Sequence, residues 1–192
     1  MGRFDEALQP LQHARALDPR SLTIRGAMLA NRLWARDLAA ATAEAEGILE
    51  FDPGNGFAID GLANLRQLQG RFDEAIDLLG QAPIPEVLRL GALGHAYARA
   101  RRPQEARQVM APLQNAEAER GYDASFALGE IHAALQEADV AFACLDRAVQ
   151  NRSPLIAWTT VEPRLDAVRG HARFEGLLWR IGFVAAIGNG SG

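Results

Sequence analysis

The feature that most constrains this chain is a hexapeptide that occurs twice. Gly-Arg-Phe-Asp-Glu-Ala occupies residues 2–7 and returns at residues 70–75. A weaker version lies midway, with Ala41 in the place of the final alanine, so the unit is 34 residues long. Ala106 and Ala141 continue the series at spacings of 31 and 35 residues. A repeat of this length is typical of stacked units that each bury an apolar face on their neighbours.

Each unit is predicted to contain two helices. Apolar residues such as Leu90, Leu93 and Tyr97 recur at helical spacing. Asp18 and Asp52 each precede a proline and lie 34 residues apart; both are expected to end a helix, because the residue before proline avoids helical angles. The predicted helices span residues 4–17, 21–35, 37–50, 55–69, 72–81, 86–101, 103–117, 122–136 and 138–151, with a last helix ending near residue 181.

The period and these residues resemble the tetratricopeptide repeat. That family has a small residue in the first helix, an aromatic residue three positions later and an alanine early in the second helix. Gly94 and Tyr97 followed by Ala106 fit this pattern, and Gly129 followed by Ala141 fits it with His132 in the aromatic position. The resemblance covers about residues 2–151 and implies an all-α fold, a right-handed superhelix of antiparallel helix pairs.

Glycine inside a helix costs about 1 kcal/mol relative to alanine. Gly94 and Gly129 are therefore expected to admit a neighbouring helix, with Ala106 and Ala141 as the matching small surface. The second unit departs from the family pattern, with Leu29 in the position of the small residue.

The expected domain organisation follows from the positions of the repeats. It consists of a half repeat (2–20), four repeats (about 21–54, 55–85, 86–121 and 122–152), C-terminal capping helices (153–183) and a flexible tail (184–192). The capping segment contains Glu-Pro-Arg-Leu at 162–165 and His-Ala-Arg-Phe at 171–174. It resembles the segment that closes repeat arrays in bacterial signalling and regulatory proteins. Its apolar side chains are expected to cover the open end of the stack: Trp158, Leu165, Phe174, Leu177, Leu178 and Trp179.

Composition argues against several classes of partner. The net charge is -4 and the pI is about 5.6, and the longest basic run is Arg101–Arg102, too short for a phosphate track. No apolar stretch is long enough for a membrane span, and the N-terminus has no signal core. We therefore expect neither nucleic acid nor membrane as a partner, and a cytoplasmic location.

The sequence shows no catalytic constellation. It contains no lysine, which excludes Schiff-base chemistry and a phosphate-loop lysine. The Asp-Glu pairs at residues 5–6 and 73–74 occupy equivalent repeat positions, so they are interpreted as helix starts rather than as acid–base pairs. Cys144 is interpreted as an inert packed thiol and His132 as a packing residue. We expect no enzyme activity, no cofactor and no metal.

The resemblance also implies a binding surface, because first helices line the concave groove in this family. Phe57 and Phe126 would anchor apolar side chains, while Asp60 and Glu130 would take basic groups. The family's carboxylate clamp uses lysines, and without lysine that clamp is not carried over. The candidate groove residues are Phe57, Asp60, Asn64, Gln67, His95, Arg99, Asp123, Phe126 and Glu130.

The predicted function is a non-catalytic scaffold that holds a peptide or protein segment in this groove. The alternative is the C-terminal sensor or regulatory repeat region of a larger bacterial signalling protein or transcriptional regulator. The half repeat would expose Phe4, Leu8 and Leu11, with Ala7 marking where a first helix should pack. This surface is expected to be covered by upstream chain, to fray, or to pair with a second copy as a homodimer.

Overall fold

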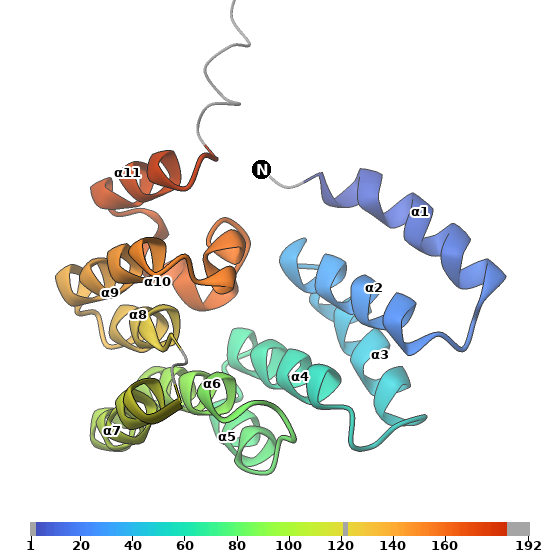
Figure 1. The fold of residues 1–192 in the computed structure, drawn as a ribbon. Coiled ribbons are helices and arrows are strands. Elements are labelled where there is room, and N and C mark those ends of the chain that lie inside the picture. The colour runs from blue at the N-terminus through green and yellow to red at the C-terminus, as the bar shows by residue number, and fades with distance from the viewer. Residues whose placement is uncertain (1–2, 121–122, 184–192) are drawn as a thin grey trace, which may run out of the picture. The chain divides into compact units, whose positions relative to one another are not determined.

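The computed structural model describes residues 3–120 and 123–183, and the predicted tail 184–192 lies outside them. The described residues form helices and turns, with no strand among them, which confirms the all-α fold class. Figure 1 shows consecutive helices running antiparallel. The helices of the repeats are α1 (Phe4–Leu17), α2 (Leu22–Trp34), α3 (Leu38–Leu49), α4 (Gly56–Leu68), α5 (Phe72–Gly80), α6 (Glu86–Arg99), α7 (Pro103–Arg120), α8 (Ser125–Ala134) and α9 (Ala138–Gln150).

The chain forms two compact units, residues 1–85 and 86–192. In the first unit, α2 packs against α3 and α4 against α5, and α2 also contacts α4. The second unit repeats this plan, with pairs α6–α7 and α8–α9 and a contact between α6 and α8. Each unit therefore brings two first helices side by side, at the place where the repeat pattern expects a binding surface.

The turn within each pair has the same backbone geometry in every repeat. The backbone carbonyl of the third-to-last residue of the first helix accepts a Schellman-type hydrogen bond from the residue after the turn. The turn residue has positive φ: 63° at Arg36, 77° at Gly70, 60° at Arg101 and 63° at Gln136. These four residues have the same spacing as the repeat alanines. The register read from the sequence is thus the register of the backbone.

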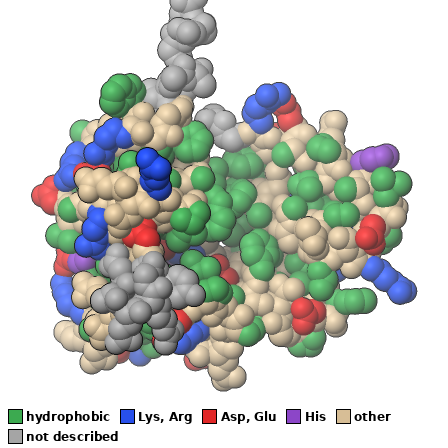
Figure 2. Space-filling view, viewed as in Figure 1, with side chains coloured by type: hydrophobic (Ala, Val, Ile, Leu, Met, Phe, Trp, Pro, Cys, Tyr) green, Lys and Arg blue, Asp and Glu red, His purple; other side chains and the backbone are tan. Residues whose placement is uncertain are grey.

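The repeat alanines pack where the register places them. Ala41, Ala75, Ala106 and Ala141 are fully buried, because each faces the first helix of its own pair. Ala7 holds the equivalent place on α1 and is exposed. No residue of α1 is fully buried, and Phe4, Leu8 and Leu11 are half-buried. On the face drawn in Figure 2, hydrophobic side chains reach the surface over α1 and α2.

The C-terminal segment begins with two short 3-10 helices, η1 (Pro154–Trp158) and η2 (Pro163–Leu165), followed by α10 (Asp166–Arg169) and α11 (Ala172–Arg180). Glu162 and His171 hold equivalent places in the two short motifs. The Glu162 carboxylate accepts from the Arg164 backbone N–H at 3.1 Å, and the His171 ring accepts from that of Arg173 at 3.2 Å. Each side chain therefore caps the helix that follows it.

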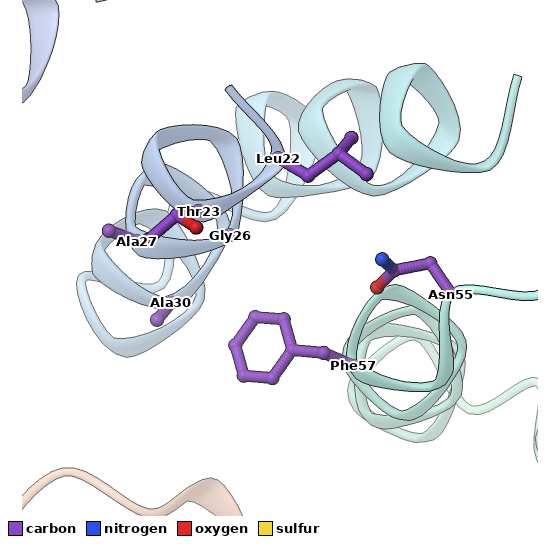
Figure 3. Close-up of a pocket in the computed structure, with 7 residues that line it drawn as sticks. All are labelled: Leu22, Thr23, Gly26, Ala27, Ala30, Asn55 and Phe57. Atoms are coloured by element: carbon purple, nitrogen blue, oxygen red, sulfur yellow. The ribbon is translucent and has the colours of Figure 1, made fainter. Parts of the chain in front are cut away.

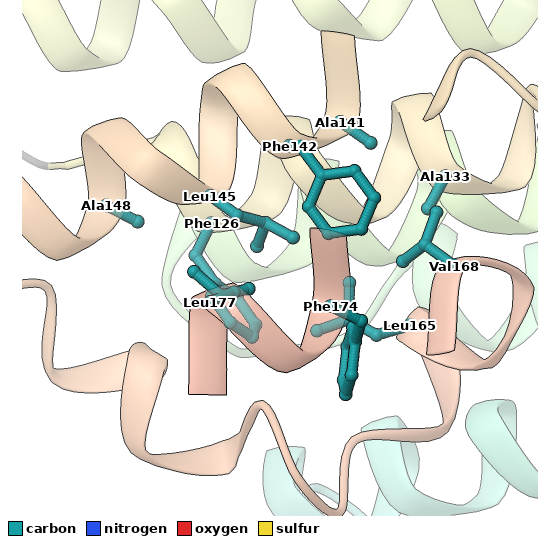
Figure 4. Close-up of a cluster of buried hydrophobic side chains, with 10 residues drawn as sticks. All are labelled: Phe126, Ala133, Ala141, Phe142, Leu145, Ala148, Leu165, Val168, Phe174 and Leu177. Atoms are coloured by element: carbon teal, nitrogen blue, oxygen red, sulfur yellow. The ribbon is translucent and has the colours of Figure 1, made fainter. Parts of the chain in front are cut away.

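Three of the predicted capping side chains enter the core of the second unit. Leu165, Phe174 and Leu177 are buried against α8 and α9 (Figure 4), and Leu178 packs at the edge of the same cluster. The prediction is wrong for Trp158 and Trp179, which are 42% and 71% exposed. Trp158 ends η1 and Trp179 lies in α11, and the apolar core of the unit is filled by the smaller Leu165, Phe174 and Leu177.

Candidate functional site

The first unit contains a pocket between α2 and α4. Its volume is about 360 Å³, and its walls come from both first helices. Figure 3 shows the Phe57 ring extending from α4 toward the small residues of α2. The lining residues are Leu22, Thr23, Gly26, Ala27, Ala30, Asn55 and Phe57.

Local structure positions Phe57 at the mouth of this pocket. Asn55 caps α4 by accepting from the Ala58 backbone N–H at 3.0 Å, and its amide donates to Asp52 at 3.1 Å. The cap fixes the first turn of α4. A Cβ built on Gly26 would lie 3.5 Å from the Phe57 ring, so the ring rests at van der Waals distance from α2. Even so, Phe57 remains 54% exposed.

The other α4 candidates lie deeper. Asp60 is half-buried, while Asn64 and Gln67 are buried. With Phe57 they follow helical spacing along one face of α4. The structure therefore brings the four α4 candidates onto one helix face, and it leaves Phe57 and Asp60 as the members that reach solvent.

In the second unit, the two candidate residues on α6 differ in exposure. On α6, Arg99 is exposed, whereas His95 is only 3% exposed. Burial holds the pKa of His95 well below its ordinary value, and the positive charges of Arg164 and Arg99 lower it further. A hydrogen bond with the Arg164 backbone acts in the opposite direction, as expected when the imidazole donates to a carbonyl.

The α8 candidates are also covered. Phe126 belongs to the hydrophobic core around Phe142 and Leu145 (Figure 4), and Glu130 is 6% exposed. Phe126 therefore acts as a packing residue in this structure, because Leu177 and its neighbours in the capping segment close over it. Its predicted role as an anchor for a partner stays a prediction.

Asp123 lies in the loop before α8 and is half-buried. Its carboxylate accepts from the Ser125 backbone N–H at 3.1 Å and from the Asn151 amide at 3.2 Å. Burial alone would raise the pKa of Asp123, but hydrogen bonds from Ser125, Asn151 and Ser153 outweigh it and lower the pKa. These hydrogen bonds connect the start of α8 to the end of α9, so Asp123 has a structural role.

Among the described residues, no group of three or more His, Cys, Asp or Glu side chains is placed to hold a metal. Cys144 is half-buried and packs at the edge of an apolar cluster. His132 contacts Glu137, with Nδ1 and Oε2 2.6 Å apart, so the residue in the aromatic position is an ion-pair partner as well as a packing residue.

Sequence reasoning missed two features of this region. The pocket wall is built from Gly26, Ala27 and Ala30, whose small side chains in α2 are a signal that could have been found. The second is that Glu162 and Arg164, far along the chain, are buried beside the second unit's first helices. That contact joins distant segments and has no counterpart in the repeat pattern.

Comparison with known proteins agrees with the repeat. A tetratricopeptide repeat family model matches residues 58–83, which cover most of α4 and all of α5. No curated protein matches the chain. The match supports a tetratricopeptide repeat protein, and repeats of this family generally mediate protein–protein interaction. The match does not reach the C-terminal segment, so the resemblance of that segment to signalling proteins stays a prediction.

In the part of the chain that the structure describes, no helix combines the length and the apolar character that crossing a membrane requires.

Proposed function

We propose that this chain is a non-catalytic binding protein that holds a segment of another protein between α2 and α4. The observation that carries the proposal is Phe57, an aromatic side chain held exposed at the mouth of a pocket walled by small residues. Aromatic residues over desolvated pockets are the usual energetic centres of protein interfaces. The family match over α4 and α5 supports the same function.

The pocket selects an apolar side chain as the anchor. Leu22, Ala27, Ala30 and the Phe57 ring offer mostly carbon surface, and full burial of a Leu- or Phe-sized side chain contributes about 1.5–3 kcal/mol. Asp60 lies one helical turn from Phe57 on the same face of α4. A basic or amide group next to the anchor in the bound segment would meet this carboxylate, which gives the interaction direction as well as affinity.

A peptide library displayed on phage and selected against the whole chain tests this proposal. We expect the selected peptides to share an apolar anchor, and we expect Phe57→Ala and Ala27→Leu to weaken their binding about tenfold or more in fluorescence anisotropy. The first variant removes a wall, and the second fills the pocket from an exposed position. Phe51→Ala is the matched control, because Phe51 is 66% exposed in the same unit but outside the pocket.

Circular dichroism of each variant establishes that the helices persist. Selected peptides that bind Phe57→Ala and Ala27→Leu as tightly as the unmodified chain would overturn the α2–α4 site.

We further propose that a second copy of the chain is a partner, through α1. The support is that α1 buries no residue fully and leaves Ala7 exposed, in the place where the other repeats bury an alanine against a first helix. A two-fold pairing would cover Phe4, Leu8 and Leu11 in both copies.

A further inference from the structure

A loop of the second unit lies across the two helices that correspond to α2 and α4. This loop, residues 159–165, is called the strap. Its η2 turn packs on α8, and the backbone of Arg164 hydrogen bonds with His95 of α6. The strap therefore bridges α6 and α8, and by the repeat spacing His95 corresponds to Ala30 in the wall of the pocket of Figure 3.

The surface under the strap is polar. His95 and Glu130 are buried there. Glu130 Oε2 lies 4.0 Å from the place where Gly91 of α6 would carry a Cβ, so its carboxylate reaches from α8 over α6. The strap adds buried polar side chains of its own, Glu162 and Arg164. Polar groups of this kind stay buried only where they are hydrogen-bonded or paired.

One side chain holds the strap in its turn. The Arg169 guanidinium donates to the carbonyl of Thr160 at 2.7 Å and to that of Glu162 at 3.0 Å, and it stacks over the Phe174 ring at 5.3 Å. Arg169 is only partly buried, with 31% of its side chain exposed. Leu165, in contrast, is fully buried in the apolar core. The strap is thus buried from Glu162 to Leu165, and Arg169 is an accessible side chain that donates to two of its carbonyls.

We propose that the strap is an intramolecular ligand that occupies the α6–α8 face and closes it to partners. When the strap lifts off α6 and α8, His95 and Glu130 become available to an extended segment of the same chemistry, an acidic residue followed by proline, arginine and an apolar residue. This inference stands independently of the α2–α4 pocket, since each lies in a different unit and neither uses the other's residues.

Tethering explains why such a site stays closed. A linked segment competes at an effective concentration of about millimolar, so a free peptide of the same sequence gains access only when the strap's own contacts are weakened. Arg169→Gln removes the charged donor to the strap carbonyls while leaving Leu165 in place. Arg180→Gln is the matched control, because Arg180 pairs with Asp146 on the surface of the same segment and does not contact the strap.

Hydrogen exchange on the whole chain tests the opening. In the unmodified chain we expect the amides of residues 161–165 to exchange at least tenfold faster than those of α8, which requires opening without unfolding of α8. Arg169→Gln should accelerate the strap amides further and leave α8 unchanged, and Arg180→Gln should change neither. Strap and α8 amides that exchange at one common rate in all three proteins would overturn the proposal.

Binding of a labelled synthetic peptide with the sequence of residues 157–170 tests the site itself. We expect it to bind Arg169→Gln at least tenfold more tightly than the unmodified chain or Arg180→Gln. In the Arg169→Gln background, His95→Ala should abolish that gain, while Phe57→Ala should not affect it. A strap that exchanges rapidly in Arg169→Gln without any gain in peptide binding would show that the strap is only a cap. Loss of binding on Phe57→Ala would place the peptide in the first unit instead.

Discussion

Among the helical glycines, the absent Cβ has different consequences at different positions. A Cβ on Gly94 would lie 2.8 Å from Ile131 Cγ1 and 2.9 Å from Val109 Cγ2. Ala106, the neighbour expected from the repeat pattern, does not contribute any of the nearest atoms. The space beside Gly94 is filled instead by Ile131 of α8 and Val109 of α7. Gly129 behaves more as expected, with the Ala141 carbonyl at 3.5 Å and Leu145 at 3.0 Å. Gly176 in α11 has no atom within 4 Å of its Cβ position.

These surroundings predict opposite effects of one substitution. Gly94→Ala should lower the free energy of unfolding by about 1–3 kcal/mol, since overpacking against Ile131 and Val109 exceeds the gain in helix propensity. Gly176→Ala should raise it by about 0.5–1 kcal/mol, because only the propensity gain remains. Urea denaturation of both variants measures the difference. Equal changes in the same direction would contradict the packing described for Gly94.

At the scale of the element, three of the four repeats join their two helices by a pair across the turn. Arg32 donates to Asp37 at 2.8 Å, and His132 contacts Glu137 with the same sequence spacing of five residues. In the fourth repeat the Arg102 guanidinium lies 4.8 Å from the centre of the Tyr97 ring. In these three repeats the residue at the aromatic position of the family pattern therefore contacts the residue five positions later, across the turn.

The pair in the last repeat predicts a pH dependence. Burial alone would raise the pKa of Glu137, but hydrogen bonding and charge from His132, together with Arg107, outweigh it and lower the pKa. A carboxyl with a lowered pKa in the folded chain stabilises the fold above its pKa in the unfolded chain, about 4.3. That stabilisation is lost as the pH falls through the lowered folded value.

Glu137→Gln should therefore reduce the free energy of unfolding at pH 7 by about 0.2–1 kcal/mol, the range measured for pairs that solvent still reaches. The deficit should shrink toward zero as the pH falls below about 4. Urea denaturation at several pH values measures it, with Glu175→Gln on the exposed face of α11 as the control. A deficit that grows on acidification would refute the assigned direction of the shift.

At the scale of the whole molecule, the helices differ in how much they bury. Four repeat alanines are fully covered, while α1 has no fully buried residue. Its contacts include a hydrogen bond from the Asn31 amide to the Phe4 carbonyl at 3.1 Å and an ion pair between Arg15 and Glu44 at 2.9 Å. These contacts attach α1 to α2 and α3 but leave Phe4, Leu8 and Leu11 only half-buried and Ala7 exposed, and this is the surface proposed for self-association.

Self-association through α1 predicts a dimer that depends on concentration. Leu8→Glu or Leu11→Glu should shift it to monomer, because each would place charge in the paired apolar surface. Sedimentation equilibrium up to high micromolar concentration measures the mass, with Val140→Glu as the control, since Val140 is exposed on α9. A monomer throughout that range would refute the dimer and leave the protein-segment proposal for α2–α4 intact.

The helix pairs could be predicted from the sequence because their causes are local and repeated. Helical spacing of apolar residues, prolines after Asp18 and Asp52, and small residues every 34 positions each act within a few turns of chain. These signals agree with one another, so the helices and the buried alanines follow from them. The candidates on α4 share one face for the same reason.

The accessibility of the candidate site was decided only by tertiary structure. The repeat pattern treats Phe57 and Phe126 alike, yet Phe57 is exposed and Phe126 is buried, because the capping segment returns over α8 and nothing described returns over the α2–α4 pocket in its own unit. His95 and Glu130 are covered for a similar reason, by a strap that begins 29 residues after Glu130 in the chain and further from His95. A repeat determines which face a residue occupies, whereas burial of that face depends on long-range contacts that local periodicity does not encode.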